Sequence, residues 1–77
     1  MTNFETAKQI GLADMNETDD MGYPVYEYAG AFAIMNADTN EGREAYEEMR
    51  RGQCCGTVEK EIEVGGEKFL YTFDYGH

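Results

Sequence analysis

The stretch VEKEIEVGGEKFLYTF, from Val58 to Phe73, constrains the fold more than any other part of the chain. The pair Gly65-Gly66 separates two runs in which apolar and polar residues alternate, which is typical of a two-residue β-hairpin. This turn would place Ile62 opposite Phe69. Successive strand side chains point to opposite faces. The face predicted to pack on the core therefore carries Val58, Ile62, Val64, Phe69, Tyr71 and Phe73.

The other face of this hairpin would carry a row of three carboxylates, Glu59, Glu61 and Glu63. Alternate residues on a strand lie about 6.6 Å apart, so the row would span about 13 Å. Like charges side by side contribute no stability, and a partner that supplies Lys or Arg would relieve their repulsion. The row is therefore a candidate partner-binding site, and its alternative interpretation is an ordinary solvated strand face.

Two helices are expected. Thr2 and Glu5 have the spacing of a capping box, which predicts a helix over about residues 3–12, and Gly11 can stop this helix in a left-handed conformation. Its buried face would carry Phe4, Ala7 and Ile10. The second helix would be capped by Asp38 and would end at Gly52. Its predicted buried stripe is Ala45, Tyr46 and Met49.

Residues 13–22 are polar and acidic and predict an exposed loop, whereas the alternation and aromatic content of residues 23–35 predict a strand. The alanines of residues 29–35 also allow a helix there. The expected fold class is α+β, with a three-stranded antiparallel sheet, two helices on one face of it, and the order helix-strand-helix-hairpin. Residues 1–77 would form a single domain. The uncovered face of the sheet and the acidic loop would then make one negative surface.

The charge balance is strongly negative, with sixteen Asp and Glu against six Lys and Arg and a formal net charge of −10. Such a charge argues against direct binding to nucleic acid and against an anionic membrane surface. It favours a basic protein partner, although an acidic surface also serves solubility alone. We expect a cytoplasmic protein, because the sequence shows neither an apolar run of about 20 residues nor a basic start followed by an apolar stretch.

Residues for catalysis or metal binding are few. The sequence has no serine, and its one histidine is His77. Cys54 and Cys55 are neighbours, which on a strand would point to opposite faces, and zinc would need two further ligands. A calcium-loop pattern fails whether it starts at Asp14 or at Asn36. We therefore predict no enzyme activity, no metal site and no cofactor.

Tyrosines and acids of the middle segment extend the candidate partner-binding site. Six tyrosines cannot all be buried in so short a chain, and tyrosine beside carboxylates is suited to gripping Arg and Lys. The predicted site therefore consists of the glutamate row together with Asp19, Asp20, Tyr26 and Tyr28.

By its small size and strong negative charge, the chain resembles the acidic inhibitors encoded by phages and mobile elements, which include anti-CRISPR proteins and DNA mimics. The resemblance implies a protein that occupies the basic nucleic-acid-binding surface of a larger effector, with the glutamate row in place of phosphates. One alternative is a small structural or regulatory subunit that forms a homodimer through its tyrosine-rich strand. Another is a small redox or metal protein that uses Cys54 or Cys55.

Overall fold

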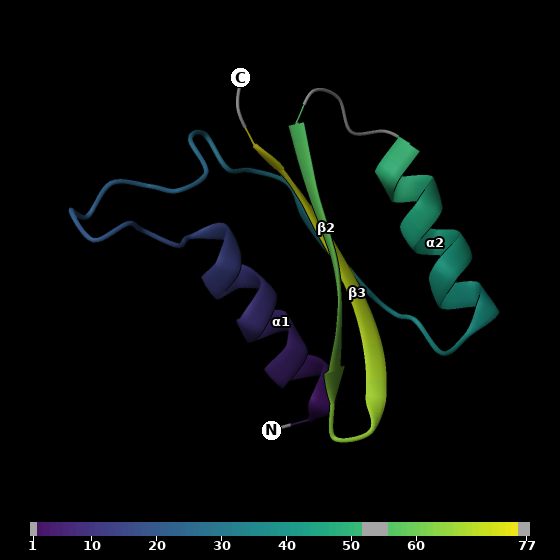
Figure 1. Ribbon diagram of the computed structural model, residues 1–77. Helices are drawn as coiled ribbons and strands as arrows, with labels where there is room; N and C mark the ends of the chain where they lie inside the picture. Colours follow the sequence, from purple (N-terminus) through teal and green to yellow (C-terminus); the bar gives the residue numbers. More distant parts are fainter. Residues whose placement is uncertain (1, 52–55, 76–77) are drawn as a thin grey trace.

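The computed structural model describes residues 2–51 and 56–75, with the side chain of Met49 excepted. Its elements, in chain order, are α1 (Asn3–Met15), β1 (Phe32–Asn36), α2 (Asn40–Arg51), β2 (Gly56–Val64) and β3 (Glu67–Tyr75) (Figure 1). The three strands form one antiparallel sheet in the order β1-β3-β2. The predicted α+β class and the order helix-strand-helix-hairpin are confirmed.

The β2–β3 hairpin has the predicted register. Ile62 pairs with Phe69 and Lys60 pairs with Tyr71. The turn residues Gly65 and Gly66 have φ angles of +58° and +85°. Positive φ at both central residues is what a type I′ turn requires, and glycine adopts it without the steric cost of a Cβ atom.

The predicted strand over residues 23–35 is wrong for its first nine residues, because β1 begins only at Phe32. Tyr28 has a φ of +56°, a left-handed conformation that an extended strand cannot contain. Two residues before β1 begins, the Gly30 N–H already donates to the Asp74 carbonyl at 2.8 Å. The chain therefore joins β3 gradually, and residues 16–31 form a long connection.

Helix α1 begins where the sequence predicts but does not end at Gly11. The capping box is present, with the Glu5 N–H donating to the Thr2 hydroxyl at 3.1 Å. Gly11 is buried inside the helix, where a Cβ atom would lie 2.7 Å from the Phe32 ring. The buried face is thus formed by Ala7 and Gly11. Two members of the predicted face are each 45% exposed, namely Phe4 and Ile10.

Helix α2 is capped one residue later than predicted. The Thr39 hydroxyl accepts from the Gly42 N–H at 3.0 Å, which is the N-cap role expected of Asp38. Asp38 instead accepts from the Lys68 N–H at 3.1 Å and so ties the start of α2 to β3. Tyr46 is buried as predicted. The Met49 side chain and the end at Gly52 lie outside the described residues.

The two helices cover opposite faces of the sheet, which corrects the prediction that both lie on one face (Figure 1). Gly11 of α1 packs against the Tyr71 ring. On the other face, the Tyr46 hydroxyl of α2 donates to the Tyr71 carbonyl at 3.0 Å, and Arg50 reaches Glu59. Ala33, only 5% exposed, pairs with Thr72 and lies on this second face.

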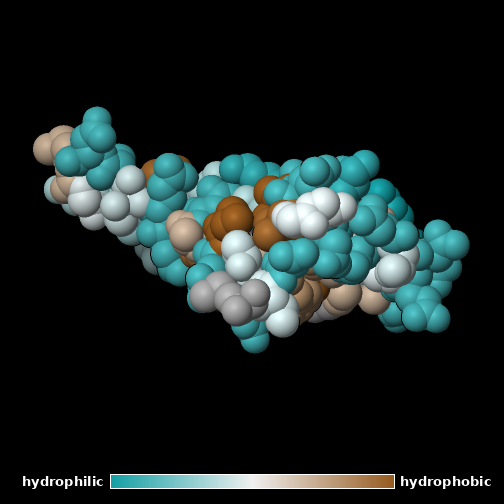
Figure 2. Space-filling model, turned by 90° about the horizontal axis from the view of Figure 1, so that it is seen from below, coloured by the Kyte–Doolittle hydropathy of each residue, from teal (hydrophilic) through white to brown (hydrophobic). Residues whose placement is uncertain are grey.

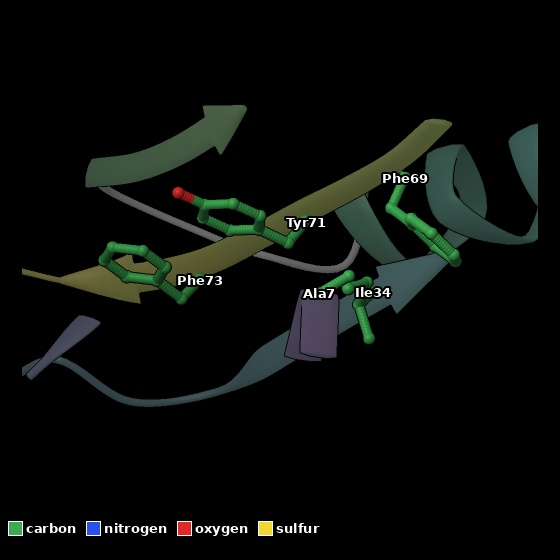
Figure 3. Close-up of a cluster of buried hydrophobic side chains, with 5 residues drawn as sticks. All are labelled: Ala7, Ile34, Phe69, Tyr71 and Phe73. Atoms are coloured by element: carbon green, nitrogen blue, oxygen red, sulfur yellow. The ribbon is translucent and has the colours of Figure 1, made fainter. Parts of the chain in front are cut away.

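The apolar core centres on β3, the middle strand. Phe69, Tyr71 and Phe73 are at most 2% exposed and pack with Ala7 of α1 and Ile34 of β1 (Figure 3). The Tyr71 and Phe73 rings stack with their centroids 6.3 Å apart. Burying side chains of this size stabilises the fold by about 2–3 kcal/mol each. The core thus fixes the shape of the hairpin. It thereby also fixes the positions of the glutamates on the hairpin's other face.

Candidate partner-binding surface

Uncompensated negative charge dominates the surface. All sixteen side-chain carboxylates of Asp and Glu lie in the described residues. Within these residues only two of them, Asp14 and Glu59, are each paired with a cation. Asp14 pairs with Lys60 at 3.0 Å, and Glu59 pairs with Arg50 at 2.9 Å. Most of the negative charge therefore faces solvent without a neighbouring cation.

The glutamate row lies on the α2 side of β2, and its three members differ. Both carboxylate oxygens of Glu59 accept from Arg50 Nη1, at 2.9 and 3.2 Å, and this contact raises the pKa of Arg50. Glu61 and Glu63 are exposed and have no ion pair within residues 2–51 and 56–75. The free charge of the row is thus at its two members nearest the hairpin turn.

A groove of about 310 Å³ lies between α2 and β2. Its lining mixes both signs of charge. The residues that line it are Arg43, Tyr46, Glu47, Arg50, Glu59, Lys60, Glu61 and Leu70. Since Arg50 pairs with Glu59, this end of the row is the less negative one, and a cationic partner would meet Glu61 and Glu63 first.

The acidic connection between α1 and β1 projects from one end of the molecule, where Figure 1 and Figure 2 both show it on the left. Asp19 holds its turn, because its Oδ1 accepts from the N–H groups of Met21 and Tyr23 at 2.9 and 3.0 Å. Asp20 is exposed and makes no such bond within the part of the chain that the structure describes. Of these two predicted site residues, Asp19 is committed to local structure and Asp20 is free to meet a partner.

Tyr26 and Tyr28 also have different positions. Tyr26 is half-buried and packs on Phe73 and Tyr75, with ring centroids 5.1 and 5.3 Å apart. Tyr28 is 73% exposed. Tyr26 therefore fastens the projecting connection to the core, whereas Tyr28 presents its ring to solvent. Further exposed apolar side chains of the same connection are Met21, Tyr23 and Val25.

Sequence reasoning missed the contact that fixes α1 to the sheet. Asp14 lies in the last turn of α1 and not in a loop, and its Oδ2 accepts from the Tyr71 hydroxyl at 2.7 Å. Burial raises the pKa of Asp14, but the Tyr71 hydrogen bond and the Lys60 ion pair outweigh it, so the pKa lies below its ordinary value. The hairpin register pairs Lys60 with Tyr71, but nothing in the sequence marks Asp14 as their neighbour, because it comes from a separate helix.

The predicted sites do not all converge. The row on β2 lies on the α2 side of the sheet, whereas Tyr26 packs on the α1 side against Phe73. Residues 2–51 and 56–75 contain no group of three His, Cys, Asp or Glu side chains arranged to hold a metal ion. The predictions for Cys54, Cys55 and His77 fall outside the described residues.

Comparison with protein-family models, with curated proteins and with solved structures gave no match. Neither α1 nor α2, the helices of the described chain, has the length and apolar character needed to cross a membrane.

Proposed function

We propose that this chain is a small acidic protein that binds the basic nucleic-acid-binding surface of a larger effector and thereby inhibits it, as anti-CRISPR proteins and DNA mimics do. The observation that supports this function best is the pair Glu61 and Glu63. Both are exposed carboxylates on a rigid strand, and neither has an ion-pair partner within the described residues. A net charge of −10 adds a field that would speed encounter with a basic surface.

The residues have distinct roles in this proposal. Glu61 and Glu63 meet cations of the effector directly. Glu59 contributes its charge to binding only when its ion pair with Arg50 breaks. Asp20 and Tyr28 offer a second contact from the projecting connection, in which Asp19 and Tyr26 hold the backbone in place. The protein carries out no catalysis and needs no cofactor or metal.

The test is capture of a partner from a lysate of the organism that carries the gene, followed by titration of the purified partner. The double variant Glu61→Lys/Glu63→Lys should lose binding, because it places cations against a basic surface. The matched control is Glu44→Lys/Glu48→Lys on exposed positions of α2, which makes the same change in net charge. The control should retain most of the affinity.

Two further measurements belong to this test. Binding should weaken as salt rises, and double-stranded DNA or RNA should compete for the same site on the partner. If the Glu61/Glu63 variant binds as well as wild type, or if nucleic acid binds the partner together with this protein, the proposed function is wrong.

The second candidate is a small dimeric structural or regulatory subunit with no inhibitory role. Its support is the group of exposed apolar side chains on the projecting connection, among them Met21 and Tyr23, which are 82% and 64% exposed. The tyrosine-rich segment is not a strand, so the dimer would form through this connection. Sedimentation equilibrium distinguishes the candidates, because a stable dimer that captures no basic partner favours the second.

A further inference from the structure

Strand β2 lies at the edge of the sheet, with β3 on only one side of it. In an antiparallel pair, successive residues direct their backbone N–H and C=O groups alternately toward and away from the neighbouring strand. The Ala37 N–H donates to the Lys68 carbonyl, and the Gly30 N–H donates to the Asp74 carbonyl. Even-numbered residues of β3 therefore direct their backbone groups toward β1.

It follows that Phe69 and Tyr71 direct their backbone groups toward β2, where they pair with Ile62 and Lys60. The β2 residues that alternate with those paired to β3 then direct their backbone groups outward, away from the sheet. These outward-directed residues of β2 are Thr57, Glu59, Glu61 and Glu63. All three residues of the acidic row thus present backbone donors and acceptors that β3 does not pair, along the same edge.

No described residue pairs with this edge of the sheet. Within residues 2–51 and 56–75, no backbone or side-chain group is hydrogen-bonded to the outward N–H and C=O groups of Glu59, Glu61 and Glu63. The helices cover the two faces of the sheet and leave the β2 edge between them (Figure 1). An unpaired nine-residue edge strand is a ready template for a further strand.

A second copy of this chain is a poor occupant of the edge. Directly opposed residues of paired strands share a face, so odd-numbered residues of one β2 would oppose odd-numbered residues of the other. Every antiparallel register that pairs seven or more residues then opposes glutamate to glutamate. The central register, for example, opposes Glu59 to Glu61 twice. Like charges in direct opposition are destabilising, so the row disfavours self-pairing.

We infer that the β2 edge binds an extended segment of the basic partner as a fourth strand, with a cation, an apolar residue and a cation opposite Glu63, Ile62 and Glu61. The cations would lie against the free carboxylates. The apolar residue would lie beside Ile62, which is half-buried and packs on the core. This inference rests on the proposed function and names the form that the partner takes at this site.

The first experiment uses a capped seven-residue peptide of alternating lysine and valine, with wild-type protein and amide hydrogen exchange followed by NMR. At saturating peptide, exchange should slow at least tenfold at the amides of Glu61 and Glu63. The amides of Lys60 and Ile62 already donate to β3 and should change little. A control peptide of the same composition, with its lysines and valines in two blocks, should give no such alternation. Binding of the alternating peptide without slowed exchange at Glu61 and Glu63 would overturn the inference, as would no binding at all.

The second experiment separates backbone pairing from charge at a single position. Both Glu61→Pro and Glu61→Gln remove the carboxylate, but only proline removes the outward N–H donor. An edge strand tolerates proline where its N–H faces solvent. The proline variant should bind the alternating peptide, and the captured partner, about tenfold more weakly than the glutamine variant.

The outcomes distinguish this inference from the function on which it rests. If the proline and glutamine variants bind equally, the edge does not accept a strand, whereas loss of binding in Glu61→Lys/Glu63→Lys still supports the proposed function. If that charge-reversed variant binds as well as wild type, the proposed function itself fails. Circular dichroism confirms that Glu61→Pro is folded, and if it is not, the exchange experiment on wild-type protein decides.

Discussion

The hydroxyl of Tyr71, in the middle of the central strand, donates a 2.7 Å hydrogen bond to the carboxylate of Asp14 in the last turn of α1. Lys60 of β2 approaches the same carboxylate oxygen at 3.0 Å. One oxygen atom thus joins the helix to two strands. Burial and the hydrogen bond to Asp14 both raise the pKa of Tyr71 well above its ordinary value, so the hydroxyl remains a donor at any physiological pH.

We expect Asp14→Asn to lower the free energy of unfolding by about 1–2 kcal/mol at neutral pH, because it replaces a charged acceptor by a neutral one. The folded-state pKa of Asp14 lies below its ordinary value of 3.8. Its contribution is therefore fully present above about pH 4 and is lost as the pH falls through the folded-state value. Urea unfolding of both proteins from pH 7 to pH 3 should show the difference between them shrinking at the acid end.

A control for this measurement is Asp20→Asn, which changes an exposed carboxylate without a hydrogen bond in the described chain. It should leave stability within about 0.5 kcal/mol of wild type across this range. A constant difference between Asp14→Asn and wild type at every pH would show that the carboxylate charge contributes nothing.

Gly11→Ala should destabilise the protein, although the same change inside an exposed helix is usually stabilising. The added methyl group would lie 2.7 Å from ring atoms of Phe32 and 3.1 Å from the Tyr71 ring. We expect a loss of about 1–2 kcal/mol in thermal or urea unfolding, since overpacking forces neighbouring rings to move. The control is Ala13→Gly on the exposed side of the same helix, which should cost about 1 kcal/mol through helix propensity alone. A stabilised Gly11→Ala protein would contradict the close packing of α1.

Local signals in the sequence predicted the elements well. The glycine pair fixed the turn, and alternation on both sides of it gave the register of β2 and β3 residue by residue. The capping box located the start of α1 for the same reason, because both depend on neighbours in the chain. The errors concern Gly11, the start of β1, the cap of α2 and the face that α2 covers. Each is decided by contacts between distant elements, and a glycine needed for close approach looks in the sequence like a glycine that ends a helix.

Arg50→Ala should strengthen binding of a basic partner. Its guanidinium pairs with Glu59, so its removal adds a third free carboxylate to the row. We expect the association rate to rise a few-fold at low salt and the difference to disappear at high salt. Stability should change little, because exposed ion pairs contribute little. Stopped-flow association at several salt concentrations measures the effect. Arg51→Ala, which removes an exposed cation without such a pair in the described residues, is the matched control.

Tyr26 and Tyr28 should respond differently to alanine substitution. Tyr26→Ala removes ring contacts with Phe73 and Tyr75 and should cost about 1–3 kcal/mol of unfolding free energy. Tyr28→Ala should stay within about 0.5 kcal/mol, since the side chain is 73% exposed, and should weaken partner binding instead. Thermal unfolding and partner titration of both variants provide the measurement. Unchanged binding by Tyr28→Ala would remove Tyr28 from the site.

Moderate salt should stabilise the protein. A net charge of −10 repels itself, and few of the described carboxylates are paired. Screening should add about 0.5 kcal/mol between low and physiological ionic strength, or about 2–4 °C in Tm for a domain of this size. The variant Glu44→Gln/Glu48→Gln should show a smaller gain, because less repulsion remains to be screened. A Tm that falls as salt is added would contradict this expectation.

The candidate site was only partly accessible to sequence reasoning. Alternation correctly placed Glu59, Glu61 and Glu63 on one face of β2. It could not reveal that Arg50 of α2 would stand over Glu59, because that depends on which face α2 covers. Asp19 and Asp20 likewise differ through the hydrogen bonds of the turn, which only Asp19 accepts. Two neighbouring aspartates look the same in the sequence.

The strand order β1-β3-β2 also bears on the sequence of events during folding. The hairpin closes through a two-residue turn, whereas β1 pairs residue 32 with residue 73 across the whole of α2. Loop closure of that length costs more entropy, so we expect the hairpin to form first and β1 to join it late. Substitutions in the hairpin core, such as Ile62→Val, should then slow folding, whereas Ile34→Val in β1 should mainly accelerate unfolding. Until β1 arrives, both edges of the nascent sheet are open, and the central strand of the native protein is itself an edge strand.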